Sequence, residues 1–485
     1  MRIRLALALT AAALPFFLSS PSAGVWQNEA LANPPLAETA PREARAAAPA
    51  SSAVTVYRGA TLIDGTGGPP RAGVSILVDG PLITAILPAG SDEGIPEGAQ
   101  IVDATGLYVL PGLIDSHVHL ATPPNRRRAE AILRRQVYGG ITAVRDMADD
   151  LRTVGDLARG ARLGELAAPD IYYAALMAGP SFFTDPRTIA VAQGETPGEV
   201  PWMQAITEET DLPLAVAMAR GTSATGIKIY ANLPGSLVER ITREAHRQNI
   251  PVWAHGMVFP ASPAEVIGAE VDVVSHVCYL AYQLSEVRPS SYQERVPVDL
   301  TPFANGDNPA MASLFRRMKA QDIILDATNR IYVEEEKRLQ VARPGDPPQC
   351  PSDLAVRLTR QAFAEGVLIS AGTDGISTWS EPYPALHEEL EILAERVGMP
   401  TLQVIQSATQ IAARTIGRES EMGTIVPGKL ANMVFVTRDP LADISNLRSV
   451  SFTVKRGKVY DRSDYVPATA EEFGIQAARE QASGN

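Results

Sequence analysis

VLPGLIDSHVHLA, residues 109–121, is an apolar run that ends in a pair of histidines, His117 and His119. The pair is notable because the chain has only 6 histidines among its 485 residues. Side chains at positions i and i+2 of a β-strand point to the same face. A strand here predicts that both imidazoles project to one side while Val118 packs on the other. A His-x-His pair by itself also fits two ordinary polar residues on a sheet.

Short apolar strands and longer amphipathic helices alternate after this stretch. Together with the strand at 107–119, we expect strands at 141–147, 171–176, 226–230, 252–255, 271–276, 323–328 and 367–374. Eight strand–helix steps over about 300 residues predict an α/β fold, a closed parallel (β/α)8 TIM barrel. An open doubly wound sheet is the alternative, but it would need a Gly-x-Gly-x-x-Gly turn, and the sequence has none.

Short β-type runs with Gly- and Pro-rich turns flank the barrel on both sides. They occupy residues 54–110 and 421–465, and we expect them to pair into one small β-sandwich because chain termini often lie close together. The barrel then spans residues 111–420, and residues 466–485 form a C-terminal tail.

The N-terminus has the pattern of an export signal. Arg2 and Arg4 precede an apolar run that is too short to span a bilayer, and small residues follow at Ala23 and Ala30-Leu-Ala32. We interpret residues 1–32 as a signal peptide and the Ala- and Pro-rich residues 33–53 as a linker. This predicts a secreted or periplasmic protein without a stable membrane anchor after cleavage; an uncleaved anchor is the alternative.

The composition limits the classes of partner. The formal charge of −12 argues against nucleic acids and anionic membranes, which both require basic patches. The charge indicates nothing more specific; a small-molecule substrate is expected, and a homo-oligomer remains compatible with the sequence. The two cysteines are too few for a disulfide framework or a thiolate metal site. They allow a single disulfide in an oxidising compartment, but we expect Cys278 to pack as a small buried apolar residue.

Chemically capable side chains stand at the ends of the predicted strands, where a barrel of this kind places its active site. They are His117, His119, Lys228, His255, His276 and Asp374. Taken singly, each has an ordinary explanation, such as a hydrogen-bonded histidine or a helix cap. Together at one rim they predict a metal site, since imidazoles and carboxylates on rigid strands hold metals at low ordering cost.

Lys228 lies in an apolar Ile-Lys-Ile context that penalises an ammonium group. An ammonium also has no lone pair to give a metal. Carboxylation by CO2 would convert the side chain into a carbamate with two oxygens, which can bridge two cations. The same period of two places Tyr230 beside Lys228 on the inner face.

These residues, in this order, resemble the amidohydrolase superfamily. The similarity rests on residues 106–119, on Ala371-Gly-Thr-Asp374-Gly, and on the return into the small β domain at 423–436. The stretch 226–230 is similar to the binuclear branch that includes Xaa-Pro dipeptidase-like enzymes and N-acyl amino acid hydrolases. The resemblance implies hydrolysis of a C–N amide bond, in a dipeptide or an N-acyl amino acid, by a metal-bridging hydroxide.

The resemblance also implies roles for the candidate residues. His117, His119 and Asp374 would hold one divalent metal, His255 and His276 the second, and carboxylated Lys228 would bridge them. Asp374 would move the proton from the nucleophile to the leaving amine, and Tyr230 would contact the substrate. The ligand set favours zinc, with manganese or cobalt fitting the same groups.

Three other functions remain open. A ring deaminase would place a glutamate three residues after the sixth-strand histidine, where this chain has Tyr279. A lactonase or phosphotriesterase-type hydrolase would use the same centre. A non-catalytic binding protein should have lost at least one of the ligands.

Several segments depart from the family pattern or carry secondary expectations. The loop after the third strand, residues 177–185, lacks a Gly-Gly-His segment, and its Phe182 and Phe183 either form an apolar wall or pack under the loop. The Pro-rich segments 296–309 and 334–350 are candidates for a lid. We expect His387 to be structural and His246 to lie on a solvated helix face, while Arg126–Arg128 either covers the surface or steers an anionic substrate.

Overall fold

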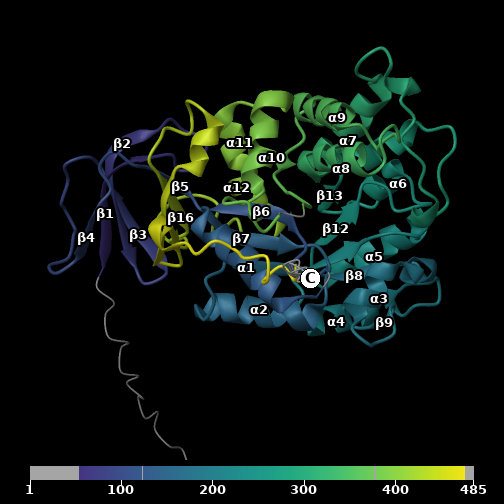
Figure 1. Ribbon diagram of the computed structural model, residues 1–485, viewed down its shortest axis with the longest axis horizontal. Helices are drawn as coiled ribbons and strands as arrows, with labels where there is room; N and C mark the ends of the chain where they lie inside the picture. The colour runs from purple at the N-terminus through teal and green to yellow at the C-terminus, as the bar shows by residue number, and fades with distance from the viewer. Residues whose placement is uncertain (1–53, 123, 376–377, 476–485) are drawn as a thin grey trace, which may run out of the picture. The chain divides into compact units, whose positions relative to one another are not determined.

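A parallel barrel forms from the predicted alternation of strands and helices (Figure 1). The computed structural model describes residues 54–122, 124–375 and 378–475. The expected signal peptide, the linker and the last part of the tail lie outside the described residues. The barrel strands are β6 (Leu113–Val118), β7 (Ile141–Asp146), β8 (Asp170–Ala178), β11 (Gly226–Ile229), β12 (Val252–His255), β13 (Val273–Ser275), β14 (Ile324–Asp326) and β15 (Ile369–Ser370).

Neighbouring barrel strands pair in parallel from β6 to β15. The last and first strands are joined by backbone hydrogen bonds. The N–H of Ser116 donates to the carbonyl of Ala371 at 2.9 Å, and the N–H of Asp374 donates to the carbonyl of His117 at 2.9 Å. These two bonds place the eighth strand's aspartate directly beside the first strand's histidine.

Helices and short strands fill the connections between the barrel strands, and further helices follow the last barrel strand, β15. The helices are α1 (Arg126–Tyr138), α2 (Leu151–Leu163), α3 (Pro186–Ala192), α4 (Leu212–Gly221), α5 (Gly235–Arg247), α6 (Pro263–Gly268), α7 (Pro309–Ala320), α8 (Asn329–Ala342), α9 (Ser352–Ala364), α10 (Leu386–Glu391), α11 (Thr401–Ser407) and α12 (Gln410–Thr415). The shorter elements are β9 (Glu199–Val200), β10 (Met203–Ala205), η1 (Pro180–Thr184), η2 (Val277–Leu284), η3 (Tyr292–Glu294), η4 (Thr301–Phe303), η5 (Ile392–Val397), η6 (Ile444–Arg448) and η7 (Arg462–Asp464).

Local sequence signals fix where these helices begin. The side chain of Asn125 accepts a hydrogen bond from the backbone N–H of Arg128 at the start of α1. Ser262 and Glu265 form a reciprocal capping box at the start of α6. None of the helices in the described ranges is long and apolar enough to cross a membrane.

A second sheet draws its strands from both ends of the described chain, as expected for the small β domain (Figure 1). Its strands are β1 (Thr55–Leu62), β2 (Arg71–Asp79), β3 (Leu82–Leu87), β4 (Gln100–Asp103), β5 (Tyr108–Pro111), β16 (Met433–Val436), β17 (Val450–Lys455) and β18 (Lys458–Asp461). The order is β18-β17-β16-β5-β1-β2-β3, with β4 on β1. Antiparallel pairing of β5 with β16 joins the two ends, and the stacked rings of Tyr57, Phe435 and Phe452 form part of a separate apolar core.

Two predicted strands differ most from the observed ones. The stretch 107–119 is not one strand but two, β5 and β6, which separate at Gly112, where the backbone changes its pairing partner from β16 to β7. Within 367–374 only Ile369–Ser370 form a strand, β15, which pairs with β14. Beyond it the chain turns, and Asp374 adopts a left-handed backbone with φ of 41°.

Cys278 is buried in the apolar core, as expected, but it is not simply an apolar packing residue. It forms the single disulfide that the sequence allowed, with Cys350, and their Cα atoms lie 6.2 Å apart. The bond joins η2, which directly follows His276, to the segment before α9. The two segments follow the neighbouring barrel strands β13 and β14, and the bond spans 72 residues of sequence.

We expect Cys350→Ser to lower the free energy of unfolding by about 2–4 kcal/mol, because the crosslink restricts a long loop of the unfolded chain. Denaturant titration of the oxidised protein measures the change. The Cys278→Ser/Cys350→Ser double variant is the control, since removing the second thiol should cost little more. Equal stability of wild type and Cys350→Ser would contradict this contribution.

Candidate metal centre

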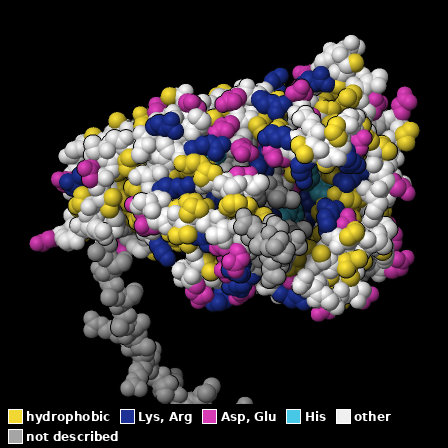
Figure 2. All heavy atoms as spheres, in the orientation of Figure 1, with side chains coloured by type: hydrophobic (Ala, Val, Ile, Leu, Met, Phe, Trp, Pro, Cys, Tyr) yellow, Lys and Arg dark blue, Asp and Glu magenta, His cyan; other side chains and the backbone are white. Residues whose placement is uncertain are grey.

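A cavity of about 430 Å³ opens at the C-terminal ends of the barrel strands. Figure 2 shows histidine side chains deep in a hollow, with lysine and arginine side chains at its rim. All seven residues proposed from the sequence line this cavity: His117, His119, Lys228, Tyr230, His255, His276 and Asp374. The fold therefore brings together side chains from the first, fourth, fifth, sixth and eighth strands.

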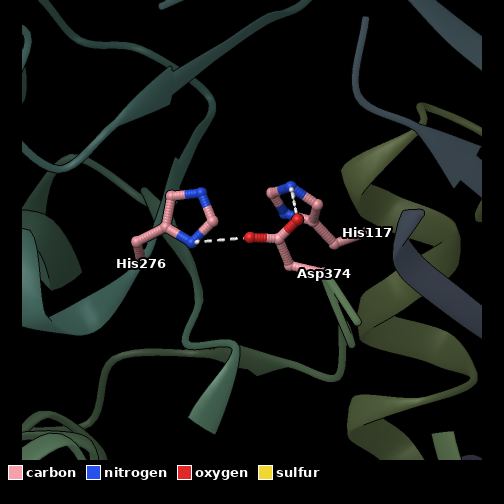
Figure 3. Close-up of side chains that lie close together, drawn as sticks. All are labelled: His117, His276 and Asp374. Atoms are coloured by element: carbon pink, nitrogen blue, oxygen red, sulfur yellow. Dashed lines mark ion pairs between the residues drawn. The ribbon is translucent and has the colours of Figure 1, made fainter. Parts of the chain in front are cut away.

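Asp374 lies at the centre of three histidines. Its Oδ1 is 3.6 Å from His117 Nε2 and 3.5 Å from His119 Nε2, and its Oδ2 is 3.7 Å from His276 Nδ1. Figure 3 shows Asp374 between His117 and His276. Donor atoms of these three residues lie within 4.8 Å of one another, close enough to share one ion.

Burial keeps most of these imidazoles neutral. It lowers the pKa of His117, His255 and His276 well below the ordinary value, and the Lys228 charge lowers each of them further. Neutral imidazole is the form that binds metals. Burial also acts to lower the pKa of His119, but the Asp149 carboxylate, 3.1 Å from its Nδ1, outweighs it and raises that pKa.

Lys228 has an amine without a hydrogen-bond partner among the described residues. The side chain is fully buried, and its Nζ contacts no acceptor there. Burial lowers the pKa of Lys228 to about 7, with a further contribution from Arg145. A substantial fraction of the amine is therefore neutral near pH 7. An unsatisfied amine on a cavity wall is a costly feature that carboxylation would relieve.

His255 and Tyr230 form the adjoining wall. Nδ1 of His255 has no hydrogen-bond partner among the described residues, and its ring centroid lies 4.1 Å from that of Tyr230. Phe182 stacks on the other side of Tyr230 with a centroid distance of 4.6 Å. Phe182 thus takes the role of an apolar wall, whereas Phe183 is buried but does not line the cavity.

Sequence reasoning missed the charged residues that orient the histidines. Asp326, on β14, places its Oδ2 2.7 Å from His117 Nδ1, 2.9 Å from the guanidinium of Arg145 and 3.0 Å from Ser275 Oγ. An ionised residue inside the apolar runs ITAVRD and IILDAT was the available signal. Because a carboxylate at Nδ1 leaves Nε2 of His117 facing Asp374, Asp326 fixes the orientation of a candidate ligand.

We expect Asp326→Asn to weaken divalent-cation binding by about 10–100-fold, because carboxylates that orient ligating histidines have effects of this size. Competition with a chelator measures the affinity. Asp272→Asn is the matched control, since Asp272 pairs with His246 outside the cavity. Equal affinities for both variants would contradict the orienting role.

The structure also places His387, the arginines of 126–128 and the two Pro-rich segments relative to the cavity. His387 is structural: it is buried, and its Nε2 hydrogen-bonds to the carbonyl of Gly139 at 3.0 Å. Arg126 and Arg127 form surface ion pairs, but Arg128 lines the cavity. Of the two lid candidates, residues 334–350 contribute Glu335 and Gln349 to the cavity, whereas no residue of 296–309 lines it.

A family profile matches the C-terminal part of the chain, from before β14 into the second sheet. Residues 316–460 match the profile of the Amidohydrolase family. The chain belongs to the amidohydrolase superfamily. Residues 316–460 include Asp374 of the candidate centre and β16 to β18 of the second sheet.

Proteins similar to this chain include enzymes named for different reactions. A 5-methylthioadenosine/S-adenosylhomocysteine deaminase of Desulforudis audaxviator is 26% identical over 373 residues, which cover 72% of this chain and 77% of the deaminase. A solved Xaa-Pro dipeptidase with bound methionine has a TM-score of 0.65 at 23% identity, covering 84% of this chain and 100% of the dipeptidase. The ochratoxinase of A. niger has a TM-score of 0.64 at 20% identity, covering 85% of this chain and 96% of the other. At these identities the structural matches establish the fold.

Proposed function

We propose that this amidohydrolase superfamily hydrolase cleaves the C–N amide bond of a dipeptide, such as an Xaa-Pro dipeptide, or of an N-acyl amino acid. The observation that carries the proposal is the cavity in which five candidate metal ligands, four histidines and Asp374, line the same wall as a buried lysine amine that has no hydrogen-bond partner among the described residues. A Xaa-Pro dipeptidase among the structurally similar proteins supports the amide as the target.

The residues present fit a pair of divalent cations. His117, His119 and Asp374 would hold one cation, and His255 and His276 the other. A carbamate on Lys228 would offer an oxygen to each and would remove the unpaired amine. Zinc suits these nitrogen and oxygen donors, and manganese or cobalt are alternatives. When bound, such cations lower the pKa of water and polarise a carbonyl.

The protein side chains would move the proton and orient the substrate. Burial raises the pKa of Asp374 above its ordinary value, although His119 and Lys228 act to lower it. A carboxylate with a raised pKa can accept a proton from the nucleophile and return it to the leaving nitrogen. Tyr230, held between Phe182 and His255, would donate its hydroxyl hydrogen to an oxygen of the substrate.

Deamination is the main rival, because the deaminase of Desulforudis audaxviator is a sequence relative. The position three residues after His276 bears on this choice. It holds Tyr279, whose ring lies 5.5 Å from that of His276 and whose hydroxyl accepts a hydrogen bond from Arg295 at 2.5 Å. A phenol engaged in this way does not supply the carboxylate of a deaminase, and this favours amide hydrolysis.

Metal analysis combined with a substrate panel tests the proposal. We expect about two divalent ions per chain and activity on Xaa-Pro dipeptides or N-acyl amino acids. Lactones, phosphotriesters and an aminopurine nucleoside are the comparison substrates. A chain that binds no metal, or that acts only on the comparison substrates, would refute amide hydrolysis.

We also propose that the protein is exported to the periplasm or secreted. The N-terminal sequence pattern and the Cys278–Cys350 disulfide support this, because disulfides persist in oxidising compartments.

A further inference from the structure

The wall of the cavity is rich in arginine, although the whole chain carries a formal charge of −12. Four arginines line it: Arg128, Arg135, Arg187 and Arg295. A cluster of cations in the mouth of an acidic protein raises the local concentration of anions. Two of them, Arg187 and Arg295, converge on a single aromatic ring.

Arg295 has no acidic partner within 4.0 Å in the described parts of the chain. Its guanidinium lies over the ring of Tyr292, 3.5 Å from the centroid, and one nitrogen donates to Tyr279 Oη at 2.5 Å. Its Nε is buried without a partner among the described residues. A partly buried guanidinium whose charge no carboxylate neutralises is unfavourable unless a ligand supplies the anion.

Arg187 reaches the same ring from the first turn of α3. Its Nη2 donates to Tyr292 Oη at 3.2 Å, and the guanidinium lies 5.5 Å from the ring centroid. Asp185 pairs with Arg187 at 2.8 Å and neutralises this charge. The pair of guanidiniums on Tyr292 therefore retains about one uncompensated positive charge.

The pKa of Tyr292 reflects this excess of positive charge. Burial acts to raise its pKa, but Arg295 and Arg187 together lower the pKa below the ordinary value. Tyr230, the proposed substrate contact, lies beside Tyr292 with a centroid distance of 5.5 Å, so the positive region adjoins the candidate metal centre.

We infer that Arg295 and Arg187 bind a carboxylate of the substrate, so that the enzyme acts on acids and not on their neutral analogues. This inference rests on the proposed amide hydrolysis and specifies its substrate class as amides that carry a free carboxylate. Guanidinium groups present paired N–H donors that match a carboxylate. The rings of Phe182, Tyr230 and Tyr292 next to them would pack against the apolar part of the same substrate.

The test compares an acid with its neutral counterpart. The probes are N-acetyl-L-methionine and N-acetyl-L-methioninamide, and release of acetate reports cleavage of the same acyl bond in both. The wild type should prefer the acid by at least about 10-fold in kcat/KM. Arg295→Gln and Arg187→Gln should each lower kcat/KM for the acid by about 10–100-fold, as expected for loss of a charge-assisted hydrogen bond, and change it little for the amide.

Arg127→Gln is the matched control, because Arg127 is exposed and pairs with Glu471 outside the cavity lining. It removes the same charge and should keep the preference for the acid. Equal kcat/KM values of the wild type for the two probes would overturn the inference and leave the proposed amide hydrolysis intact. Equal losses on both probes in Arg295→Gln and Arg187→Gln would also overturn it, since they would indicate a general structural role.

Calorimetric titration with the same two probes separates this inference from the proposed function. If neither probe is cleaved, amide hydrolysis fails for this substrate class. Tighter binding of the acid than of the amide by the wild type, lost in Arg295→Gln, would still support the carboxylate site. Equal binding of both probes would reject it.

Discussion

Lys228→Ala should lose both divalent-cation binding and hydrolysis, with kcat/KM lower by at least about 10³-fold, or roughly 4 kcal/mol of transition-state stabilisation. The reason is the position of the amine. It is buried, has no hydrogen-bond partner among the described residues, and lies close enough to His117, His255 and His276 for its charge to lower their pKa values. Alanine cannot supply the two oxygens that a carbamate at this position would offer. Elemental analysis and steady-state kinetics on the same preparation measure both losses.

Two further variants test whether the loss comes from the missing carbamate. Lys228→Arg keeps a cation but cannot be carboxylated, so it should resemble the alanine variant. Lys337→Ala removes an exposed lysine that pairs with Glu334, and it should leave metal content and rate unchanged. Added acetate, as a carboxylate that fits the space left by the side chain, should restore part of the activity of Lys228→Ala. Two bound cations and full activity in Lys228→Ala would reject the bridging role.

Asp374→Asn is the second variant with a large expected effect. Proton transfer by a positioned side chain contributes about 10²–10⁴-fold to a rate, and the amide can neither accept nor return a proton. The asparagine keeps the size of the side chain and the three neighbouring imidazoles. We therefore expect kcat to fall by about 10²–10⁴-fold, with a smaller change in KM.

Metal content shows which role of Asp374 is lost. Retention of both cations at the reduced rate would indicate loss of the proton carrier, whereas loss of one cation would indicate loss of a ligand. Asp353→Asn, which changes an exposed carboxylate paired with Arg396, is the control. Near wild-type kcat in Asp374→Asn would refute its role in proton transfer.

Much of the candidate site was predictable because several of its residues lie close together along single strands. The period of two along a strand places His117 beside His119 and Lys228 beside Tyr230 without knowledge of the rest of the fold. The apolar runs that end in His255 and Asp374 indicated strand ends in the same way. Backbone geometry alone sets these relations.

The strand limits were less predictable, because packing decides them. Gly112 divides the first predicted strand where Thr142 of the neighbouring strand leaves no room for a Cβ. His276 directly follows β13 and Asp374 lies beyond the end of β15, and both have left-handed backbone conformations, with φ of 71° and 41°. Such backbone states occur where surrounding contacts impose them, commonly at functional sites.

The sequence by itself determined the alternating strand–helix order, the strand ends that carry histidines, and the apolar setting of Lys228. These features depend on residues that are near one another along the chain. Only the tertiary structure decided that Asp326 orients His117 across 209 residues, that Cys278 joins Cys350, and that Arg187 and Arg295 meet at Tyr292. Contacts between distant segments depend on strand register and barrel closure, and neither is written in the local periodicity of the chain.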